Sequence, residues 1–427
     1  MASVFFKTMG CAANMSDSEV MEGLLKEANF IIAEDIDSAE LVVINICTVK
    51  GNVKALRAVR SAIDGYKDKK IIVAGCLTKE VMTEIKKIAP RANFLSTNNI
   101  KNIITVAEKT LHGKSANILK RGNSSKINFP KIRKNPVIGI APISSGCLGN
   151  CSYCSVRKIK GKLFSYHVKD IIQEIKKCLE DGCKEIWLTS QDTGAYGKDT
   201  KTNITKLLKE VISIEGNFFV RLGMINPNHA MEFADDLIEI YKNRKIFKFM
   251  HIPVQSASNR ILKLMKRKYT VEEFKKLIKK LKAGIPNLTL STDIICGFPT
   301  ETKEEFNESL NLIKEIKPDL LHISRFRPRE GTEAAKMKQT ENDEVKHRST
   351  VMTTTFSWVL VENNLKYRHW KGDVMIDEIG TENNFIGRNS NYKQFIINND
   401  SRIKLGDIVK VRVVRANTYD LKAEIVE

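Results

Sequence analysis

Short apolar runs alternate with amphipathic stretches over the first 110 residues of the chain. The apolar runs fit buried strands, and the stretches between them repeat apolar residues at the spacing of a helix. The runs are residues 4–6, 41–46 and 71–74, and the amphipathic stretches are residues 16–28, 49–66 and 78–88. This alternation predicts helices packed around a parallel sheet, so we expect an α/β domain over residues 1–112.

The same alternation resumes at greater length between residues 136 and 367. Six strands are expected there, each followed by a helical pattern, and residues 341–367 are predicted to form the last helix. The expected strands are residues 137–143, 185–190, 218–225, 247–254, 288–296 and 320–326. Six such units predict a parallel sheet curved into a partial (β/α)6 barrel, whose active site would lie at the carboxyl ends of the strands.

Two further regions have a different pattern. Residues 113–135 contain seven Lys or Arg and no acidic residue, together with Gly122-Asn123-Ser124-Ser125, which predicts a basic linker. After Trp370 the chain changes to period-two strands separated by turn residues. These strands are expected at residues 374–379, 385–386, 395–397 and 408–414. They predict a small all-β barrel over residues 368–427.

Composition adds a strong positive charge to this picture. Seventy Lys and Arg against fifty Asp and Glu give the 427 residues a net charge of +20. Such an excess attracts polyanions and favours RNA or DNA as a partner, although solvated lysine-rich helices explain it equally well. We find neither an apolar run of ~18 residues nor a secretory signal, so a cytoplasmic protein without a membrane anchor is expected.

Three of the nine cysteines lie close together in the sequence. Cys147, Cys151 and Cys154 follow a predicted strand with the spacing C-x3-C-x2-C. Three thiolates on one loop can ligate three irons of a [4Fe-4S] cluster and leave the fourth iron open for a small molecule. A structural zinc site is the alternative, but zinc takes four ligands and the next candidate, His167, is thirteen residues away. Disulfides are not expected, because the cytoplasm keeps thiols reduced.

Three other cysteines are far apart in the sequence but occupy equivalent positions. Cys11, Cys47 and Cys76 each end or follow a predicted strand of the amino-terminal sheet. Because the carboxyl ends of parallel strands meet at one rim, we expect these cysteines to converge and hold a second cluster, where an exogenous sulfur atom could be carried. The alternative is that each fills space in the core. That is our interpretation of the remaining cysteines, Cys178, Cys183 and Cys296.

The loop Cys147–Cys154, with Tyr153 before its third cysteine, resembles the cluster loop of the radical S-adenosylmethionine (SAM) superfamily. The residues around the other trio also resemble a known family. Residues 7–11, 45–49 and 74–77 are similar to the amino-terminal domain of the methylthiotransferases. Together the two matches cover about 300 residues. One departure is Ala12-Ala13, where many relatives carry a polar residue, and it leaves the surroundings of Cys11 open.

This resemblance implies cofactors and site residues. It implies SAM and two [4Fe-4S] clusters, ligated by Cys11, Cys47 and Cys76 and by Cys147, Cys151 and Cys154. It places Tyr153 near the adenine of SAM and Gln255 near the SAM pocket. It also implies that a loop contacts the methionine moiety of SAM, through Gln191, Asp192, Thr193 and Gly194. From the residues alone, each of these could equally be a turn or a cap.

The resemblance also implies a reaction. The stretch Asp192–Gly197 is most similar to the archaeal and eukaryotic branch that methylthiolates threonylcarbamoyladenosine at tRNA position 37. Family members that act on isopentenyladenosine in tRNA, or on an aspartate of a ribosomal protein, are alternatives, as is a non-catalytic iron-sulfur protein that binds RNA. In the implied mechanism one SAM methylates a sulfur at the Cys11 cluster. A second SAM is cleaved to a radical that activates C2 of adenine.

The implied partners are tRNA, an electron donor of ferredoxin or flavodoxin type, and a sulfur donor. The carboxyl-terminal module resembles the TRAM domain, an RNA-binding barrel. In it, Lys410, Arg412 and Arg415 alternate with Val411 and Val413, which offers either a basic face for tRNA or a solvated strand face. The basic residues of 113–135 are a second candidate source of phosphate contacts.

Overall fold

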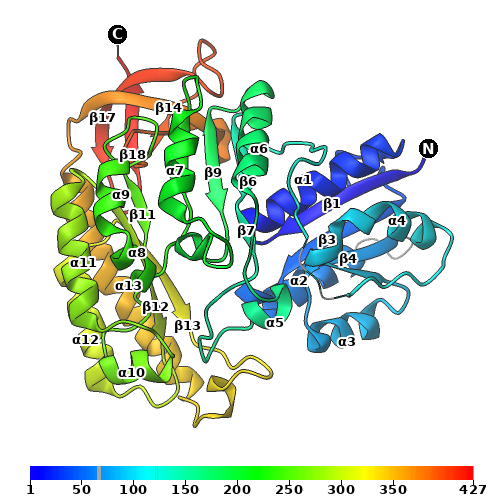
Figure 1. The fold of residues 1–427 in the computed structure, drawn as a ribbon, viewed down its shortest axis with the longest axis horizontal. Helices are drawn as coiled ribbons and strands as arrows, with labels where there is room; N and C mark the ends of the chain where they lie inside the picture. Colours follow the sequence, from blue (N-terminus) through cyan, green and yellow to red (C-terminus); the bar gives the residue numbers. More distant parts are fainter. Residues whose placement is uncertain (65–68, 121, 123, 427) are drawn as a thin grey trace.

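The computed structural model describes residues 1–427 except 65–68, 121, 123 and 427. It has three parts, an amino-terminal α/β domain, a larger barrel-like domain and a small closed β-barrel (Figure 1). This arrangement confirms the predicted fold class. Among the described residues, we find no helix with the length and apolar character needed to cross a membrane.

The amino-terminal domain is built on a parallel sheet with strand order β2-β1-β3-β4-β5. Its central strand β3 is buried along its whole length, and all its residues except Asn45 are apolar, as expected for a sheet covered by helices on both sides. Helices α1 and α4 pack on one face, and α2 and α3 on the other. The elements are β1 Ser3–Met9, α1 Ala12–Glu27, β2 Ile31–Ile32, β3 Leu41–Cys47, η1 Thr48–Lys50, α2 Asn52–Asp64, β4 Lys70–Cys76, α3 Lys79–Ile88, β5 Asn93–Ser96, η2 Thr97–Asn102 and α4 Ile103–Leu111.

The larger domain contains the six predicted strands, arranged as two parallel sheets in the orders β10-β9-β6 and β11-β12-β13. A single bridge between Val220 and Ile246 joins the two sheets, so the barrel is split between β10 and β11. One hydrophobic core fills the space between these strands and the surrounding helices. The elements are β6 Ile138–Pro142, β7 Ser144–Ser145, α5 Val156–Lys160, β8 Phe164–Ser165, α6 Val168–Glu180, β9 Glu185–Thr189, η3 Thr193–Ala195, α7 Ile204–Ser213, β10 Phe219–Leu222, α8 Pro227–Glu232, α9 Ala234–Ile240, β11 Phe249–His251, α10 Asn259–Leu264, α11 Val271–Gly284, β12 Thr289–Cys296, α12 Lys303–Ile316, β13 Leu320–Arg325, η4 Ala334–Lys336 and α13 Asn342–Leu365.

Some boundaries differ from those expected. Strand β11 covers only three residues of the expected 247–254, because Pro253 lacks the N–H group needed to continue a strand and Gln255 has a φ of +73°. The helix expected over 49–66 is α2, Asn52–Asp64, and residues 65 and 66 of that expectation lie outside the described residues.

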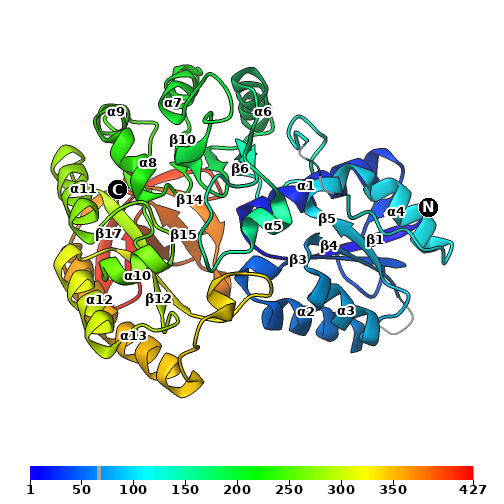
Figure 2. The ribbon, with the colours of Figure 1, turned by 60° about the horizontal axis from the view of Figure 1, so that its bottom comes forward.

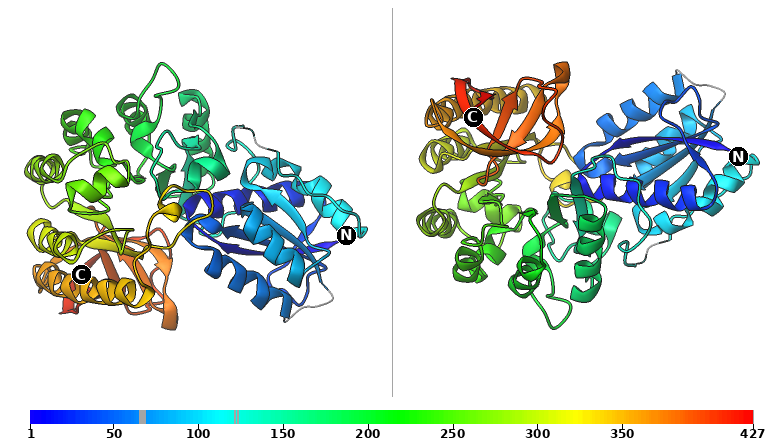
Figure 3. Two further views of the ribbon diagram at one scale, coloured as in Figure 1. Left: turned by 90° about the horizontal axis from the view of Figure 1, so that it is seen from below. Right: turned by 90° about the horizontal axis from the view of Figure 1, so that it is seen from above.

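The carboxyl-terminal module is a closed barrel with strand order β14-β15-β16-β18-β17. The last strand, β18, was not predicted, although Leu421 and Ala423 are buried and Lys422 is exposed between them. The module covers the amino ends of the larger barrel's strands, since the backbone N–H of Lys248 donates to the carbonyl of Ser390 at 2.9 Å (Figure 3). Its elements are β14 Lys371–Ile379, η5 Thr381–Asn383, β15 Phe385–Arg388, β16 Gln394–Ile397, β17 Ile408–Ala416 and β18 Leu421–Ile425.

The segment 113–135 is tied to both neighbouring domains. Its basic side chains pair with carboxylates of α1 in one domain and of α6 and its carboxyl end in the other. The ion pairs are Lys126–Asp17, Lys131–Glu174, Arg133–Asp181 and Lys134–Glu22. The side chains of Lys126, Lys131 and Arg133 are at most 8% exposed, so the expectation that they contact phosphates is wrong for these three. Arg121 and Asn123 of this segment lie outside the described residues.

Candidate metal centres

The C-x3-C-x2-C loop is held against the chain that follows α5. The backbone N–H of Cys147 donates to the carbonyl of Gly161 at 3.2 Å. At Gly146, whose φ is +74°, a Cβ atom would lie 2.0 Å from the carbonyl oxygen of Lys162. Only glycine permits both this backbone conformation and this close approach. The loop is therefore fixed at the carboxyl end of the barrel strands, where the sequence predicted it.

Gly149 lies beside the sulfur atoms of Cys147 and Cys151, and its lack of a side chain leaves space next to them. The backbone N–H of Gly149 donates to Sγ of Cys147 at 3.3 Å. A Cβ atom at Gly149 would lie 3.4 Å from Sγ of Cys147 and 3.9 Å from Sγ of Cys151. Cys154 is joined to the same turn, because its backbone N–H donates to the carbonyl of Cys151 at 3.1 Å. Soft sulfur donors gathered on one half-exposed turn fit a [4Fe-4S] cluster.

Arg267 contacts this loop, and the sequence analysis missed it. Its Nη1 donates to Sγ of Cys151 at 3.3 Å, and Nη2 donates to the side chain of Asn226. Its Nε donates to the hydroxyl of Tyr269 at 2.9 Å. Arg267 stands between Lys266 and Lys268, and such a basic run is typical of solvated surface, so no sequence signal distinguished it.

The cysteines that are far apart in sequence do converge. Cys11 is the N-cap of α1, Cys47 ends β3 and Cys76 ends β4. Cys47 and Cys76 are register partners on adjacent strands. The thiol of Cys47 lies within hydrogen-bonding distance of those of Cys11 and Cys76. The three sulfur atoms thus form one group at the rim of the sheet.

Polar groups under this trio fix the geometry. The amide Oδ1 of Asn14 accepts from Sγ of Cys11 at 3.3 Å, and its Nδ2 donates to Oδ1 of Asn45 at 3.1 Å and to the carbonyl of Ile46 at 3.2 Å. Gly75, with a φ of +107°, lies so close to Ile46 that a Cβ atom would be 2.3 Å from its carbonyl oxygen. The residues beneath the sulfurs are therefore rigidly interlocked.

The two trios differ in their tendency to ionise. The hydrogen bond from Cys47, and then the charge of Lys160, lower the pKa of Cys11 to about 5. The same two causes lower the pKa of Cys76 to about 7, although burial opposes them. The hydrogen bonds with Cys11 and Cys76, and then burial, raise the pKa of Cys47. In the loop trio, burial raises the pKa of Cys147 to about 12 and also raises the pKa of Cys154.

Two buried lysines near the Cys11 trio were also missed by the sequence analysis. Lys126 donates to both carboxylate oxygens of Asp17, at 2.9 and 3.0 Å, and to the hydroxyl of Thr97 at 2.8 Å. Lys160 ends α5, and its charge acts on all three thiols and on Asp17. Neither lysine belongs to the amino-terminal domain itself. Their positions depend on how the domains pack, which sequence periodicity does not report.

The residues expected near SAM lie along the rim that carries the cysteine loop. Tyr153 packs edge-on against Phe298, with ring centroids 6.4 Å apart. Gln255 is 8% exposed, and its backbone N–H donates to the carbonyl of Asp293 at 2.8 Å. Gln191 has a buried side-chain carbonyl, Oε1, without a hydrogen-bond partner among the described residues. An unsatisfied buried acceptor at this place fits an incoming donor such as an ammonium group.

The next three expected residues use their side chains to build the loop. The carboxylate of Asp192 accepts from the backbone and side chain of Asn226 and from Nδ1 of His229 at 3.0 Å. These hydrogen bonds lower the pKa of Asp192 although burial opposes them. The hydroxyl of Thr193 donates to the carbonyl of Met224 at 3.0 Å. A Cβ atom at Gly194 would lie 2.5 Å from Ile225. Only the backbone of these residues remains to contact a ligand.

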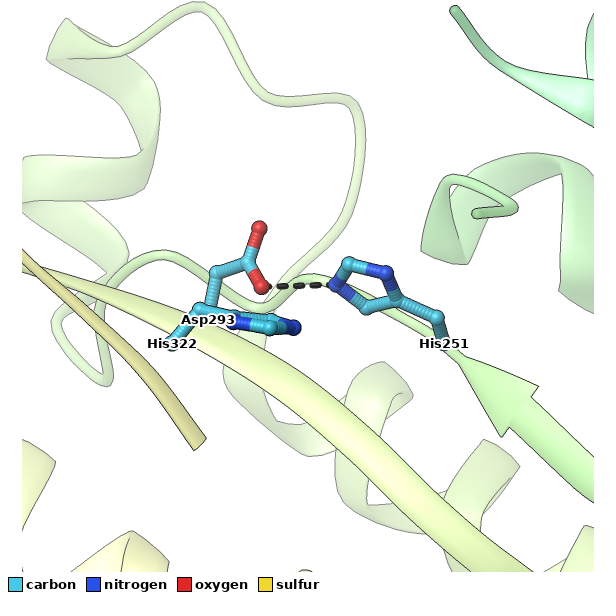
Figure 4. Close-up of side chains that lie close together, drawn as sticks. All are labelled: His251, Asp293 and His322. Carbon is cyan, nitrogen blue, oxygen red and sulfur yellow. Dashed lines mark hydrogen bonds and ion pairs between the residues drawn. The ribbon is translucent and has the colours of Figure 1, made fainter. Parts of the chain in front are cut away.

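A third polar group lies inside the barrel, below this rim. His251 ends β11, Asp293 lies on β12 and His322 on β13, and their side chains gather in one place (Figure 4). The Nε2 atom of His251 lies 2.6 Å from Oδ1 of Asp293, and the rings of His251 and His322 are 5.0 Å apart. One potential ligand atom from each residue lies within 4.8 Å of the others. The group offers both donors and acceptors to a molecule in the barrel.

The remaining cysteines and the basic strand lie where the sequence placed them. Cys178, Cys183 and Cys296 are at most 2% exposed and belong to the core of the larger domain, which confirms their packing role. On β17, Lys410, Arg412 and Arg415 are exposed, while Val411 and Val413 are buried.

Three family patterns match the sequence. They are the Radical SAM superfamily over residues 141–313, Uncharacterized protein family UPF0004 over residues 3–96, and the TRAM domain over residues 371–426. Full-length relatives carry a more specific name. A protein of Pyrococcus horikoshii named "Probable threonylcarbamoyladenosine tRNA methylthiotransferase" is 40% identical over the whole of both chains. A Homo sapiens protein named "Threonylcarbamoyladenosine tRNA methylthiotransferase" is 34% identical over 99% of this chain and 73% of its own length.

Solved structures share the fold at low sequence identity. The radical S-adenosylmethionine methyltransferase TsrM from Kitasatospora setae matches 78% of this chain and 77% of its own, with a TM-score of 0.56 and 13% identity. The cobalamin-dependent radical enzyme OxsB matches 84% of this chain and 56% of its own, with a TM-score of 0.53 and 12% identity. At such identity the likeness concerns the fold alone.

Proposed function

The chain belongs to the threonylcarbamoyladenosine tRNA methylthiotransferases, and from this premise we propose which of its residues carry out the reaction. It is a radical SAM enzyme that methylthiolates threonylcarbamoyladenosine in tRNA, with SAM and two [4Fe-4S] clusters as cofactors. When bound, these cofactors supply the reductive cleavage of SAM and the sulfur and methyl groups that are transferred.

The observation that carries the proposal is the presence of two separate trios of thiols. Cys147, Cys151 and Cys154 would hold the cluster that binds SAM, and Cys11, Cys47 and Cys76 would hold the auxiliary cluster. We call these the loop trio and the sheet trio. Each offers three sulfur donors rather than the four of a closed structural site, so each leaves an iron free to bind a further ligand.

Several side chains would orient SAM at the loop trio. The unsatisfied Oε1 of Gln191 would accept from the amino group of SAM, and the backbone from Asp192 to Gly194 would line its methionine moiety. Tyr153 and Gln255 would lie beside the adenosine. Arg267 holds Sγ of Cys151 and thereby keeps the loop in position.

The substrate base would enter the barrel from the rim that carries the cysteines. There the group His251, Asp293 and His322 offers hydrogen bonds to the polar substituent of the nucleoside. The TRAM barrel closes the opposite end of the strands, so a bound tRNA would have to reach around the domain. We propose that the exposed face of β17 with Lys410, Arg412 and Arg415 binds its phosphates.

The remaining partners follow from the chemistry. Reductive cleavage of SAM requires an electron donor, for which we propose a protein of ferredoxin or flavodoxin type, and the transferred sulfur requires a sulfur donor. We place the reaction in the cytoplasm, where tRNA is modified and thiols stay reduced.

The test is mass spectrometry of tRNA nucleosides from cells with and without this protein. We expect the methylthio derivative of threonylcarbamoyladenosine to disappear without the protein and to return with the wild-type chain but not with Cys76→Ala. The matched control is Cys183→Ala, which removes a buried cysteine that belongs to neither trio. Restoration by Cys76→Ala, or transfer in vitro to a ribosomal protein and not to tRNA, would contradict the proposal.

A further inference from the structure

The polar group inside the larger barrel, His251, Asp293 and His322, is gathered by the topology of its sheet (Figure 4). The three residues come from adjacent strands in the order β11-β12-β13. Asp293 and His322 are register partners, and His251 is the register partner of Ser291, two residues before Asp293. Register partners in a parallel sheet present their side chains on the same face. All three side chains therefore lie on one face of the sheet.

This face is the inner one. Helices α11, α12 and α13 run along the outer side of the sheet (Figure 2), where Leu290 and Ile294 of β12 pack in the core of the domain. The side chains of His251 and Asp293 are 17% and 24% exposed, and His322 is exposed. A molecule inside the barrel can therefore contact all three residues.

The donor atoms of the group suit a metal ion. Two imidazoles and one carboxylate form a common ligand set for a divalent transition-metal ion, such as zinc or ferrous iron, that keeps open positions for a further ligand. One potential ligand atom from each residue lies within 4.8 Å of the others, so an ion at the usual distance of about 2.0–2.2 Å requires only small side-chain adjustments. The 2.6 Å contact between Nε2 of His251 and Oδ1 of Asp293 is a hydrogen bond. An ion would replace the proton of that bond, because ligands release protons when a metal binds.

A buried hydroxyl beside the group is a second sign of a ligand. Ser291 is 0% exposed, and its Oγ has no hydrogen-bond partner within the part of the chain that the structure describes. It lies on the same face of β12 as Asp293 and next to His251 in register. A buried hydroxyl without a partner is unfavourable, and a water molecule bound to an ion in this group would supply one.

The charge of the substrate also favours an ion at this place. The threonylcarbamoyl substituent carries a carboxylate and a hydroxyl. A substrate carboxylate next to Asp293 would be repelled, because like charges close together destabilise each other. A divalent ion reverses the sign of the local charge and offers open positions to both oxygen groups.

We propose that His251, Asp293 and His322 bind a divalent transition-metal ion whose open positions receive the carboxylate and the hydroxyl of the threonylcarbamoyl substituent. The inference rests on the proposed function for the identity of this substituent, and it adds the ion that joins the group to it. The ion holds the nucleoside in place and takes no part in the transfer of sulfur.

Zinc is the probe, because it forms stronger complexes than ferrous iron and its X-ray absorption edge is separate from that of the cluster irons. Zinc is added to the full-length enzyme with both clusters assembled, so that the six cluster cysteines are occupied, and unbound zinc is removed by desalting. We expect about one zinc per chain, with nitrogen and oxygen neighbours at about 2.0–2.2 Å in the zinc absorption spectrum. Sulfur neighbours at about 2.3 Å, or no retained zinc, overturn the inference.

Two variants assign the zinc to this group. Asp293→Asn and His322→Gln should each weaken zinc binding by more than about a hundredfold, since even the loss of an outer partner of a metal ligand costs about 10- to 100-fold. His347→Gln removes an exposed histidine of α13 and is the matched control, which should leave zinc binding unchanged. Iron content is measured in each variant, and about eight irons per chain show that the clusters and the fold are retained. Wild-type zinc affinity in Asp293→Asn and His322→Gln overturns the inference.

Recognition of the substituent is tested separately with two forms of one tRNA, which carry threonylcarbamoyladenosine or unmodified adenosine at position 37. The zinc-loaded wild type should bind the first form more tightly, and His322→Gln should lower this preference by about tenfold or more, the usual effect of one interaction with a charged group. A preference that survives loss of zinc in His322→Gln overturns the role of the ion in recognition. Equal binding of both forms by the wild type contradicts the proposed function instead, and the zinc spectrum still decides the metal site.

Discussion

The loop trio and the sheet trio bring three sulfur atoms together in opposite ways. Cys147, Cys151 and Cys154 lie within eight consecutive residues, and the turns of one loop place them. Cys11, Cys47 and Cys76 are separated by about thirty residues each, and only the register of a parallel sheet places them. The loop can present its ligands once it is locally ordered, whereas the sheet trio exists only in the folded domain.

The charged residues around the two trios also differ in origin, since those of the loop trio come from its own domain and those of the sheet trio come from outside it. The loop trio is contacted by Arg267, which comes from the same domain. The sheet trio receives the charges of Lys126 and Lys160, which come from the connecting segment and from α5. The centre built from distant residues therefore depends on correct docking of its neighbours as well. This dependence can be tested by breaking each centre separately.

The largest expected effect is a separation of the two half-reactions. Cys151→Ala should abolish formation of 5'-deoxyadenosine from SAM, because the loop trio can no longer complete its cluster. Cys76→Ala should keep this cleavage and lose the methylthio product. Both products are measured by mass spectrometry of anaerobic reactions that contain a strong reductant. Loss of 5'-deoxyadenosine in Cys76→Ala, with iron retained at the loop, would show that the two centres are not independent.

A smaller effect is expected from the ion pair that ties the segment 113–135 to α6 of the larger domain. Lys131 and Glu174 are 3% and 1% exposed, and Lys131→Met leaves the Glu174 carboxylate buried without its counter-charge. This should cost about 3–5 kcal/mol of unfolding free energy, measured by denaturant titration of the cluster-free protein. Lys87→Met removes the exposed pair with Glu84 and should cost less than about 1 kcal/mol. Equal costs for the two variants would mean that the buried pair contributes no more to stability than the exposed one.

Arg267→Met should weaken the loop trio alone. The variant removes the donor to Sγ of Cys151, and a hydrogen bond to a charged group contributes about 1.5–3 kcal/mol. Iron should therefore be lost faster to a chelator from the loop cluster in a protein that lacks the sheet trio. In a protein that lacks the loop trio instead, the same substitution should leave the rate of iron loss unchanged. A change there would indicate a general loss of stability.

The smallest expected effect concerns pH. Iron displaces the protons of thiols, so a thiol with a raised pKa binds iron less readily as the pH falls. Burial raises the pKa of both Cys147 and Cys154 in the loop trio. In the sheet trio the pKa of Cys47 is raised, but those of Cys11 and Cys76 are lowered to about 5 and about 7. Lowering the pH from about 8.5 to about 6.5 should therefore slow cluster assembly more at the loop trio than at the sheet trio. Iron uptake by proteins with one trio each measures this, and a steeper dependence at the sheet trio would contradict it.

Local patterns in the sequence predicted much of the fold. The six barrel strands and the parallel sheet followed from apolar runs, because buried strands in a parallel sheet are apolar on both faces. Short strands were missed where burial depends on a distant partner. Strand β18 has only five residues, yet it closes the small barrel by pairing with β16 and β17. Nothing within those five residues indicates these partners.

The ligands were easier to predict than their surroundings. The positions of Cys11, Cys47 and Cys76 at strand ends were enough to predict that they converge. The carboxyl ends of parallel strands always meet at one edge of the sheet, whatever the side chains around them. Lys160 and Arg267 could not be recognised in this way. Each lies among other basic residues in the sequence, and only the packing of separate elements buries Lys160 and brings Arg267 against Sγ of Cys151.

The ion-paired segment between residues 126 and 134 changes how the chain should respond to a protease. By composition it is an ideal trypsin substrate, since trypsin cleaves after lysine and arginine. A protease must draw several residues into an extended conformation before it cuts, and this would break pairs to α1 and α6 together. Digestion of the native protein should therefore spare the bonds after Lys126, Lys131 and Arg133, whereas the exposed Lys114 and Lys120 of the same segment stay open to cleavage.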